Sequence, residues 1–509
     1  MFKTKTNLII IFFCVFNLTL HIIADFNSGF QGDELLHIET GNHPDFGYME
    51  FPPVIGWLAF IQNLFHSNSV FVNHIFCHIA STLILILAAL TTIALGGKSK
   101  AVFIMLLCIS VMPARAYQLF QPVVFTHLFW LLSFYQFVRF VKTLENKYLL
   151  YLTISLAFGF LTKFDILFFI AGLVSLLFFN RTQKVILTKS IWKYILIFIF
   201  IISPNLILQY QHQFPVLNMF SLLYKTQLDK LTISGVLKDL IIMLNPLTVI
   251  IWVGGLFFMF SKKYSSFFRP IAISIIISLL LFSITKSKAY YFVPAILTLL
   301  MFGSVWFEQN VLAKRKLVLY PATILLIASG ILFAPFGLSL LPLDNFVKFA
   351  KLKMKNERFQ NERFQVDCQE YFAQAKWKNT LTALKQVYDS LPQTEKQTCM
   401  IWGKHYSQSG GVNLYRADYG LPKAFSYHGS FYLWTPESGA IPKTVIAFTN
   451  GEADINFFQD FFGSVVAVKK VYNPYASFDK DLYQTIFICK EPKQDFAGLR
   501  TALKNRIFE

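Results

Sequence analysis

The sequence predicts a polytopic α-helical membrane protein with a soluble α/β domain at its C-terminal end. Three observations lead to this fold class. The chain has 509 residues, 55% of them hydrophobic, and a mean hydropathy of +0.50, whereas soluble domains are roughly 45–50% apolar. Apolar runs long enough to cross a bilayer, about 20 residues each, repeat through the first two thirds of the chain. After residue 345 the hydropathy becomes that of a soluble domain.

Eleven apolar runs are candidate membrane spans. The first follows Lys3 and Lys5, is long and has no Ala-x-Ala cleavage site, so we interpret it as an uncleaved span rather than a signal peptide. Two of the runs are short and would have to be extended or tilted. The predicted spans are 8–24, 69–95, 101–113, 121–140, 148–162, 164–180, 191–209, 238–260, 270–285, 289–307 and 317–336.

The basic residues predict the orientation. With a cytoplasmic N-terminus, each even-numbered connection lies in the cytoplasm and carries Lys or Arg, as the positive-inside rule requires. This distribution also argues that the formal charge of +18 does not reflect nucleic-acid binding. An odd number of spans places the C-terminal region outside. The basic residues of these connections are Lys98, Lys100, Arg139, Lys142, Lys147, Arg181, Lys184, Lys189, Lys193, Lys262, Lys263, Arg269, Lys314, Arg315 and Lys316.

The predicted domains are a membrane domain (1–340), a linker (341–365) and an outer α/β domain (366–509). The membrane domain carries two long outer loops, 25–68 and 210–237. Alternating helix-like and strand-like segments indicate the α/β class of the last domain. Six cysteines are too few for a disulfide framework in a chain of this length, and the absence of a CxxC pair argues against a thiolate metal site. The helix-like segments are 376–391 and 453–462, and the strand-like segments are 397–402, 443–449, 464–471 and 483–489.

The acidic pair Asp33-Glu34 follows the first span, and carboxylates at a hydrocarbon boundary usually have a function. Four cations lie at the outer ends of spans, where the orientation rule disfavours them. Together these groups predict an outer pocket for a lipid phosphate, because Arg binds phosphate with a bidentate fork and Lys with a point charge. The four cations are Arg115, Lys163, Lys286 and Lys288.

Each of these residues also has an ordinary structural explanation. A lysine at a helix end commonly extends to lipid headgroups, and Lys163 could pair with Asp165. Tyr290 and Tyr291 could be interfacial belt residues. Asp33 could N-cap a helix over residues 34–40.

The pocket suits glycosyl transfer from a polyprenyl-phosphate sugar. The leaving phosphate needs cations to stabilise its growing charge, and an acceptor hydroxyl needs a carboxylate base. A transporter of a lipid or an anionic glycan could use similar groups, although it would carry broken helices with charges near mid-membrane. A catalytically inactive binding protein is a third alternative.

The sequence resembles the GT-C glycosyltransferases, in the branch that contains protein O-mannosyltransferases and lipid A aminoarabinose transferases. Asp33-Glu34 and Tyr48–Pro53 resemble the family's Asp-Glu and acidic–x–Pro-Pro elements. Gly159–Phe164 and Lys286–Tyr291 resemble its Ser-Lys-Tyr and Lys-x-Tyr-Tyr stretches. The tail segments Tyr406–Gly411, Tyr419–Pro422, His428 and Tyr432–Trp434 resemble the periplasmic tail of bacterial members; packing and turn formation explain them equally well.

The resemblance implies a base, Asp33, supported by Glu34, and an undefined acceptor that is lipid, glycan or protein. It also implies a bacterial inner membrane, so the outer C-terminal domain would be periplasmic. No nucleic-acid partner and no metal ligand are predicted, and a divalent metal is left open. The matches at Lys163 and Lys288 imply contact with the donor phosphate. With the cations and tyrosines noted above, the predicted donor-phosphate ligands are Lys163, Lys286, Lys288, Arg115, Tyr290 and Tyr291, and the predicted acceptor or loop residues are Glu50, His43 and His127.

Two departures from the family pattern stand out. Phe51 replaces the His or Lys that usually precedes Pro52-Pro53, so a phosphate contact is lost there. The segment 121–127 contains no acid where many relatives have one. A second carboxylate role therefore has no candidate in that segment, unless His127 substitutes for it.

Overall fold

The structure is a computed structural model that describes residues 4–113, 115–187, 191–261, 265–354, 369–451, 455–475 and 482–508. It consists of two compact units. Unit 1 is Met1–Ile23, Phe51–Val54 and His74–Leu340, and unit 2 is Ala24–Glu50, Ile55–Asn73 and Leu341–Glu509. Most of the first long loop therefore groups with the C-terminal region. Lys3, Lys189, Lys262, Lys263 and linker residues 355–365 lie outside the described residues.

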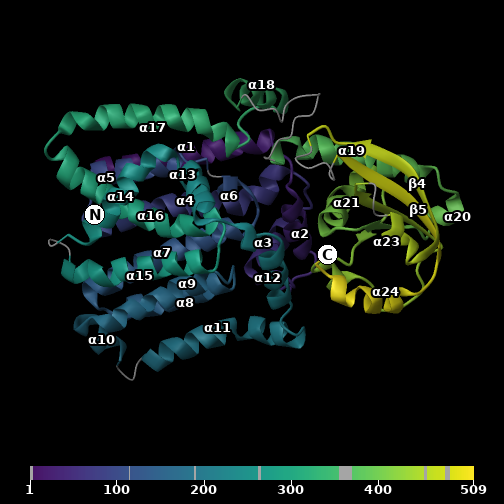
Figure 1. The fold of residues 1–509 in the computed structure, drawn as a ribbon, viewed down its shortest axis with the longest axis horizontal. Coiled ribbons are helices and arrows are strands. Elements are labelled where there is room, and N and C mark those ends of the chain that lie inside the picture. Colours follow the sequence, from purple (N-terminus) through teal and green to yellow (C-terminus); the bar gives the residue numbers. More distant parts are fainter. Residues whose placement is uncertain are drawn as a thin grey trace. The chain divides into compact units, whose positions relative to one another are not determined.

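Unit 1 is a bundle of apolar helices (Figure 1), which confirms the predicted helical fold class. Helical residues occupy each of the predicted spans. Six described helices are long and apolar enough to cross a membrane, or up to eight if each of two bent pairs is one span, so the count of eleven stays a prediction. The elements are α1 (Thr4–Phe26), α4 (Val70–Ala94), α5 (Ser99–Ser110), α6 (Arg115–Gln118), α7 (Pro122–Thr143), α8 (Asn146–Phe160), α9 (Ile166–Gly172), η1 (Leu173–Phe178), α10 (Asn180–Ile186), α11 (Ile191–Gln211), α12 (Pro215–Thr226), η2 (Leu228–Lys230), α13 (Ile233–Met243), η3 (Pro246–Thr248), α14 (Val249–Met259), α15 (Ser265–Ile284), α16 (Ala289–Trp306), η4 (Phe307–Leu312), η5 (Lys316–Val318), α17 (Leu319–Phe333) and η6 (Ala334–Phe336).

The predicted span 238–260 is not one straight helix. The chain bends by 98° between Ile233–Met243 and Pro246–Met259. Pro246 cannot donate a backbone hydrogen bond to the preceding turn, which ends the helix there. Asn245 completes the break: its side chain accepts from Leu247 N at 3.2 Å and donates to Val111 O at 3.2 Å. Asn245 thus pairs the backbone N–H of Leu247 after the break and links the break to the chain at Val111, as an apolar environment favours.

Several helices of unit 1 carry large apolar side chains on their outer faces. Examples are Phe12 on α1, Phe200 on α11 and Ile331 on α17, which are 61%, 80% and 71% exposed. A soluble monomer rarely exposes apolar surface on this scale, whereas lipid contact stabilises it. Unit 1 is accordingly a membrane domain.

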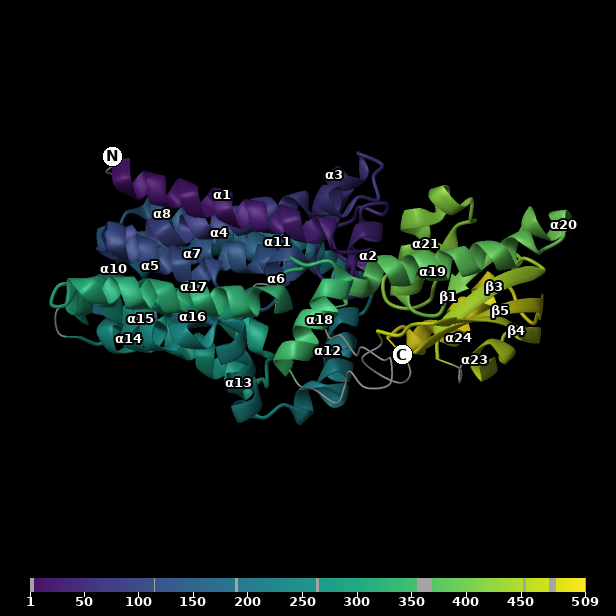
Figure 2. The same ribbon diagram turned by 90° about the horizontal axis from the view of Figure 1, so that it is seen from above.

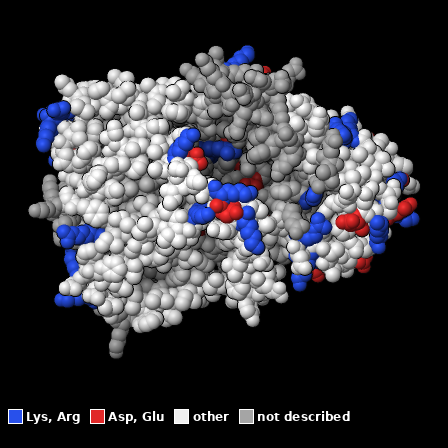
Figure 3. Space-filling model, in the orientation of Figure 1, with Lys and Arg blue, Asp and Glu red and all other residues white. Residues whose placement is uncertain are grey.

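One end of the unit 1 bundle gathers the basic connections. The Glu308 carboxylate accepts from the backbone N–H of Lys98 at 2.7 Å, Lys142 Nζ donates to Ala94 O, and Arg181 donates to Lys142 O at 3.0 Å. Figure 3 shows Lys and Arg side chains along this end, where α10 and the start of α17 lie in Figure 1. The clustering agrees with a shared cytoplasmic side, although the orientation itself stays a prediction.

Unit 2 contains a five-stranded mixed sheet, which confirms the α/β prediction for the C-terminal region. The strand order is β2-β1-β3-β5-β4, with β1 parallel to β2 and β3, and β5 antiparallel to β3 and β4. Figure 2 shows α19 and α21 on one side of the sheet and α23 and α24 on the other. The elements are α2 (Gly32–Thr40), α3 (Val54–Asn63), α18 (Leu343–Met354), α19 (Glu370–Asp389), α20 (Gln393–Lys396), β1 (Met400–Gly403), α21 (Tyr406–Tyr419), β2 (Ala424–Phe425), α22 (Phe431–Trp434), β3 (Thr444–Asn450), α23 (Ile455–Gln459), β4 (Phe462–Tyr472), β5 (Tyr483–Pro492), α24 (Phe496–Leu503) and η9 (Lys504–Arg506).

The core of this α/β region forms around Trp402 on β1. Trp402 is buried among Phe425, Ala447, Phe458 and Phe487, together with residues of α24. In register, Trp402 pairs with Ala447, and Ala447 pairs with Phe487, so successive strands present their apolar residues on the same face. This packing fixes the sheet from which α21 and the segment 426–435 emerge.

Candidate active site

The two carboxylates of the acidic pair have different environments in the first turn of α2. Gln31 is the N-cap: its Oε1 accepts from Asp33 N at 2.9 Å, and Glu34 Oε2 accepts from Gln31 N at 2.8 Å. This is a capping box, so the alternative that Asp33 caps the helix is wrong. Glu34 is fully buried and completes the cap, whereas the Asp33 carboxylate takes no part in it.

Asp33 is hydrogen-bonded to the C-terminal region of unit 2. The Tyr406 hydroxyl donates to Asp33 Oδ1 at 2.7 Å. Burial, reinforced by the nearby Asp33 charge, raises the pKa of Tyr406 well above its ordinary value, so the phenol stays protonated and can donate. Gly410 lets α21 approach α2, because a Cβ there would lie 2.7 Å from Leu35 O.

Two histidines surround Tyr406. The ring centroid of His405 lies 3.9 Å from that of Tyr406 and 4.3 Å from that of His428, and the Tyr406 and His428 rings are 4.9 Å apart. Burial and the neighbouring His405 hold the pKa of His428 well below its ordinary value, so His428 is neutral at pH 7. His405 also accepts from Ser407 N at 3.2 Å and thereby caps α21. This cluster fixes the ring of Tyr406 from two sides.

Glu50 is a second carboxylate held by the C-terminal region. Its Oε1 accepts from Ser430 N at 2.8 Å, and its Oε2 accepts from Ser430 Oγ. Ser430 Oγ in turn accepts from Met49 N at 3.0 Å. Desolvation raises the pKa of Glu50 to about 7, despite the hydrogen bonds from Ser430, and the Asp33 charge adds to the increase. Gly429 has φ +60, and a Cβ on it would lie 1.8 Å from Glu50 Oε1, so this contact requires glycine.

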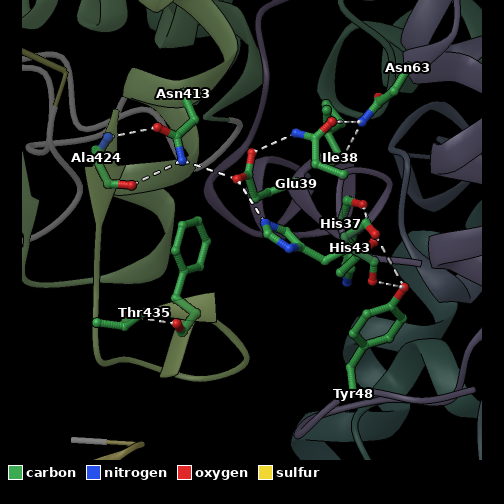
Figure 4. Close-up of polar contacts among 12 residues, drawn as sticks. His37, Ile38, Glu39, His43, Tyr48, Asn63, Asn413, Ala424 and Thr435 are labelled. Atoms are coloured by element: carbon green, nitrogen blue, oxygen red, sulfur yellow. Dashed lines mark hydrogen bonds and ion pairs between the residues drawn. The ribbon is translucent and has the colours of Figure 1, made fainter. Parts of the chain in front are cut away.

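The last turn of α2 is anchored in the same way (Figure 4). Asn413 Nδ2 donates to Glu39 Oε1 at 3.1 Å, and His43 Nε2 lies 3.6 Å from the same oxygen. The His43 ring stacks on Trp434, with centroids 4.4 Å apart and an interplanar angle of 6°. Tyr48 donates to the carbonyl oxygens of Thr40 and His43 at 3.2 Å. His43, predicted as an acceptor or loop residue, thus lies in a network that orders the loop.

In unit 1, the structure brings four of the predicted residues together. Lys163 Nζ lies 3.7 Å from the ring centroid of Tyr291 and 4.9 Å from that of Tyr290. The two tyrosines stack on each other at 4.5 Å. His127 is linked to the same place by a hydrogen bond to the Tyr290 backbone, and its Nδ1 lies 3.3 Å from the Tyr117 hydroxyl. The alternative pairing of Lys163 with Asp165 is also present, at 3.5 Å.

The other predicted cations of unit 1 have different partners. Lys286 Nζ donates to Asp229 O at 2.9 Å, and Lys288 Nζ donates to Gln227 Oε1 at 2.6 Å. Both therefore hold the segment that follows α12. Arg115 begins α6 and is partly buried. Among the described residues, no group of three or more His, Cys, Asp or Glu side chains is arranged to hold a metal ion.

Two solved structures of one protein, ArnT, share the fold of this chain. ArnT from Cupriavidus metallidurans bound to undecaprenyl phosphate aligns with 94% of this chain and 97% of its own, with a TM-score of 0.54 and 11% identity. Its apo state aligns over the same shares with a TM-score of 0.56 and 10% identity. The chain has the GT-C fold. Unit 1 and unit 2 are both included in these alignments.

A family model and a further solved structure also match parts of the chain. Residues 50–208 match the model of the dolichyl-phosphate-mannose-protein mannosyltransferase family. The Archaeoglobus fulgidus oligosaccharyltransferase in its apo form is 11% identical over 82% of this chain and 64% of its own, with a TM-score of 0.45. No curated protein sequence matches the chain. The matched family and these structural neighbours are glycosyltransferases.

Sequence reasoning gave no role to Tyr406, Asn413 or Ser430. The partners of Tyr406 and Ser430 lie more than 370 positions away in sequence, beyond any helix or strand periodicity. One signal was available, because Tyr406–Gly411 and His428 belong to tail segments that resemble those of bacterial relatives. The structure places both segments against the acidic residues of the first loop.

Proposed function

We propose that the protein transfers a sugar from a polyprenyl-phosphate carrier to an acceptor hydroxyl at the outer face of the bacterial inner membrane, with inversion. The N-terminus would be cytoplasmic, and the C-terminal α/β domain, residues 366–509, would be periplasmic. The main support is the Asp33 carboxylate of a GT-C fold, which is fixed through Oδ1 by Tyr406. Within the described residues, Asp33 Oδ2 makes no hydrogen bond. That oxygen can therefore take the proton from the hydroxyl group of the sugar acceptor.

In the proposed step, the acceptor oxygen attacks the anomeric carbon while its proton passes to Asp33 Oδ2. The bond between the anomeric carbon and the phosphate oxygen breaks, and the carrier phosphate leaves with the electron pair. Glu34 holds the turn that carries Asp33 through the capping box. General-base catalysis requires that Asp33 Oδ2 lie within hydrogen-bond distance of the acceptor hydroxyl.

The leaving phosphate is assigned to the cations of unit 1. Lys163, beside Tyr290 and Tyr291, is the first candidate, and Lys286, Lys288 and Arg115 are the others. One ion pair at 4 Å contributes about 4 kcal/mol at an effective dielectric constant of 20. The undecaprenyl phosphate bound by ArnT supports a carrier of this class. The sugar is proposed to be a hexose or pentose.

The test is transfer from undecaprenyl-phosphate sugars with labelled hexose or pentose, using purified protein and a membrane extract as the source of acceptor. Asp33→Asn keeps an oxygen that can accept from Tyr406 but removes the base, so turnover should nearly vanish while donor binding persists. Asp45→Asn, an exposed acid in the same loop, is the matched control. Near-normal turnover of Asp33→Asn would exclude Asp33 as the base.

Transport of a lipid-linked glycan is the second candidate, because unit 1 contains two bent helix pairs. A transporter would also require charges near the breaks, and the break at 244–246 contains Leu, Asn and Pro. In vesicles, a transporter would move labelled donor across the bilayer without forming a new glycosidic product. Donor binding without turnover or movement would support an inactive binding protein.

A further inference from the structure

A polar cleft of about 530 Å³ lies within unit 2, beside the last turn of α2. Its walls come from α2, the loop after α3, and α21. Four carboxamides and two carboxylates line it: Asn42, Asn63, Asn68, Asn413, Glu39 and Asp418. A cleft of this size is within the usual range for ligand sites, but its lining is unusually polar.

The cleft is connected to Asp33 through two helices that run in the same direction. Tyr406 of α21 bonds Asp33 in the first turn of α2, and Asn413 of α21 bonds Glu39 in the last turn. At a rise of 1.5 Å per residue, Glu39 lies about 9 Å along α2 from Asp33. A ligand in the cleft could therefore extend along α2 to the proposed base, Asp33.

Internal hydrogen bonds fix the lining groups in place. Asn63 Nδ2 donates to Asn42 Oδ1, Asn42 Nδ2 donates to Glu39 Oε2, each at 3.0 Å, and Asn68 Nδ2 donates to Asp418 Oδ2. Among the described residues, nothing donates to Asn63 Oδ1 or Asn68 Oδ1. Oriented acceptors with no protein donor are suited to ligand hydroxyl groups, because a preorganised site loses little entropy on binding.

The charges of the cleft balance. Glu39 and Asp418 contribute two negative charges, and Arg416 and Lys423 contribute two positive charges, so the lining is neutral overall. Three of its fourteen lining residues have apolar side chains (Ile38, Leu414 and Ala417), so polar and charged side chains predominate. A neutral ligand rich in hydroxyl groups matches this lining better than a lipid, a polyanion or a polycation.

We infer that this cleft binds a neutral glycan, the part of the acceptor that lies next to the reacting sugar or hydroxyl. The inference rests on the proposed function for the acceptor role, but the binding itself does not. Carboxamides and carboxylates recognise sugar hydroxyls because they supply both donors and acceptors in fixed directions.

The test measures binding of four neutral disaccharides (maltose, cellobiose, chitobiose and mannobiose) to the full-length protein by saturation-transfer NMR. Ala417→Trp fills the cleft from an exposed position, and Asn68→Leu removes the carboxamide of one lining residue. Each should weaken binding about ten-fold or more, the effect of one or two lost hydrogen bonds. Asn379→Leu on the exposed face of α19 is the matched control and should bind as the wild type does. Thermal unfolding of each variant reports folding separately.

Disaccharide binding that is lost in Ala417→Trp but kept in Asn379→Leu supports the inference. The inference would be overturned if none of the four disaccharides bound, or if Ala417→Trp bound them as well as the wild type does. It would also be overturned if only a tripeptide or a lysophospholipid, and no disaccharide, competed for the cleft. Donor turnover is measured on the same samples. Disaccharide binding without any donor turnover would refute the proposed function while leaving the glycan site intact, and the reverse pattern would refute only the site.

Discussion

The hydroxyl of Tyr406 donates a 2.7 Å hydrogen bond to Asp33 Oδ1, and the two residues are 373 positions apart. The carboxylate proposed as the base thus depends on the C-terminal region for its position. The hydrogen bond occupies Oδ1 and leaves Oδ2 for the hydroxyl group of the sugar acceptor. Tyr406 is a positioning residue, since it acts on the substrate only through Asp33.

Tyr406→Phe should lower kcat for sugar transfer while leaving the donor KM nearly unchanged. A hydrogen bond to a charged group contributes about 1.5–3 kcal/mol, which corresponds to a decrease of about 10- to 100-fold. The donor KM should hardly change because Tyr406 contacts Asp33 and not the carrier phosphate. Tyr419→Phe, at the end of the same helix, is the control. A higher donor KM with an unchanged kcat in Tyr406→Phe would contradict the positioning role.

Glu50 should make the stability of the protein depend on pH. Its pKa in the folded protein is about 7, above the roughly 4.3 of an unfolded glutamate, so the folded state binds the proton more tightly. This stabilisation is fully present below about pH 4.3 and is lost as pH rises through about 7. We expect the Tm of the wild type to fall relative to that of Glu50→Gln as pH rises from 4 to 8.5, because the Gln side chain does not titrate. Thermal unfolding of both proteins across this range measures the difference. A constant difference would contradict the elevated pKa.

The sequence predicted the parts of the fold that depend on local pattern. Apolar runs and strand-like segments indicated the helices and the sheet, and the Asn245-Pro246 pair is a breaker signal that explains the bent helix in retrospect. The pairings of Asp33 with Tyr406 and of Glu50 with Ser430 could not be predicted, because no periodicity relates residues so far apart. They depend on how α21 and segment 426–435 leave the sheet around Trp402.

Gly429→Ala should destabilise the protein more than Gly420→Ala does. Both glycines have a positive φ, +60 and +61, so both substitutions bear similar backbone strain, about 1–2 kcal/mol. Only the Gly429 Cβ would collide with Glu50 Oε1, at 1.8 Å, whereas nothing lies within 4 Å of a Cβ on Gly420. The difference in Tm between the two variants therefore measures the Glu50 contact. Equal losses would mean that the Glu50 carboxylate can move away at little cost.

Lys163 should control the affinity for the donor phosphate through its charge. Lys163→Met is expected to weaken binding of undecaprenyl phosphate about ten-fold or more, because a close cation is lost from a partly buried site, while Lys163→Arg keeps most of the affinity. Lys193→Met is the matched control: Lys193 also lies over a tyrosine ring, at 4.9 Å from Tyr194, but in the connection predicted to be cytoplasmic. If Lys163→Met binds the lipid phosphate as the wild type does, Lys163 serves only the Asp165 pair and the tyrosine stack, and the phosphate must be held by Lys286, Lys288 or Arg115.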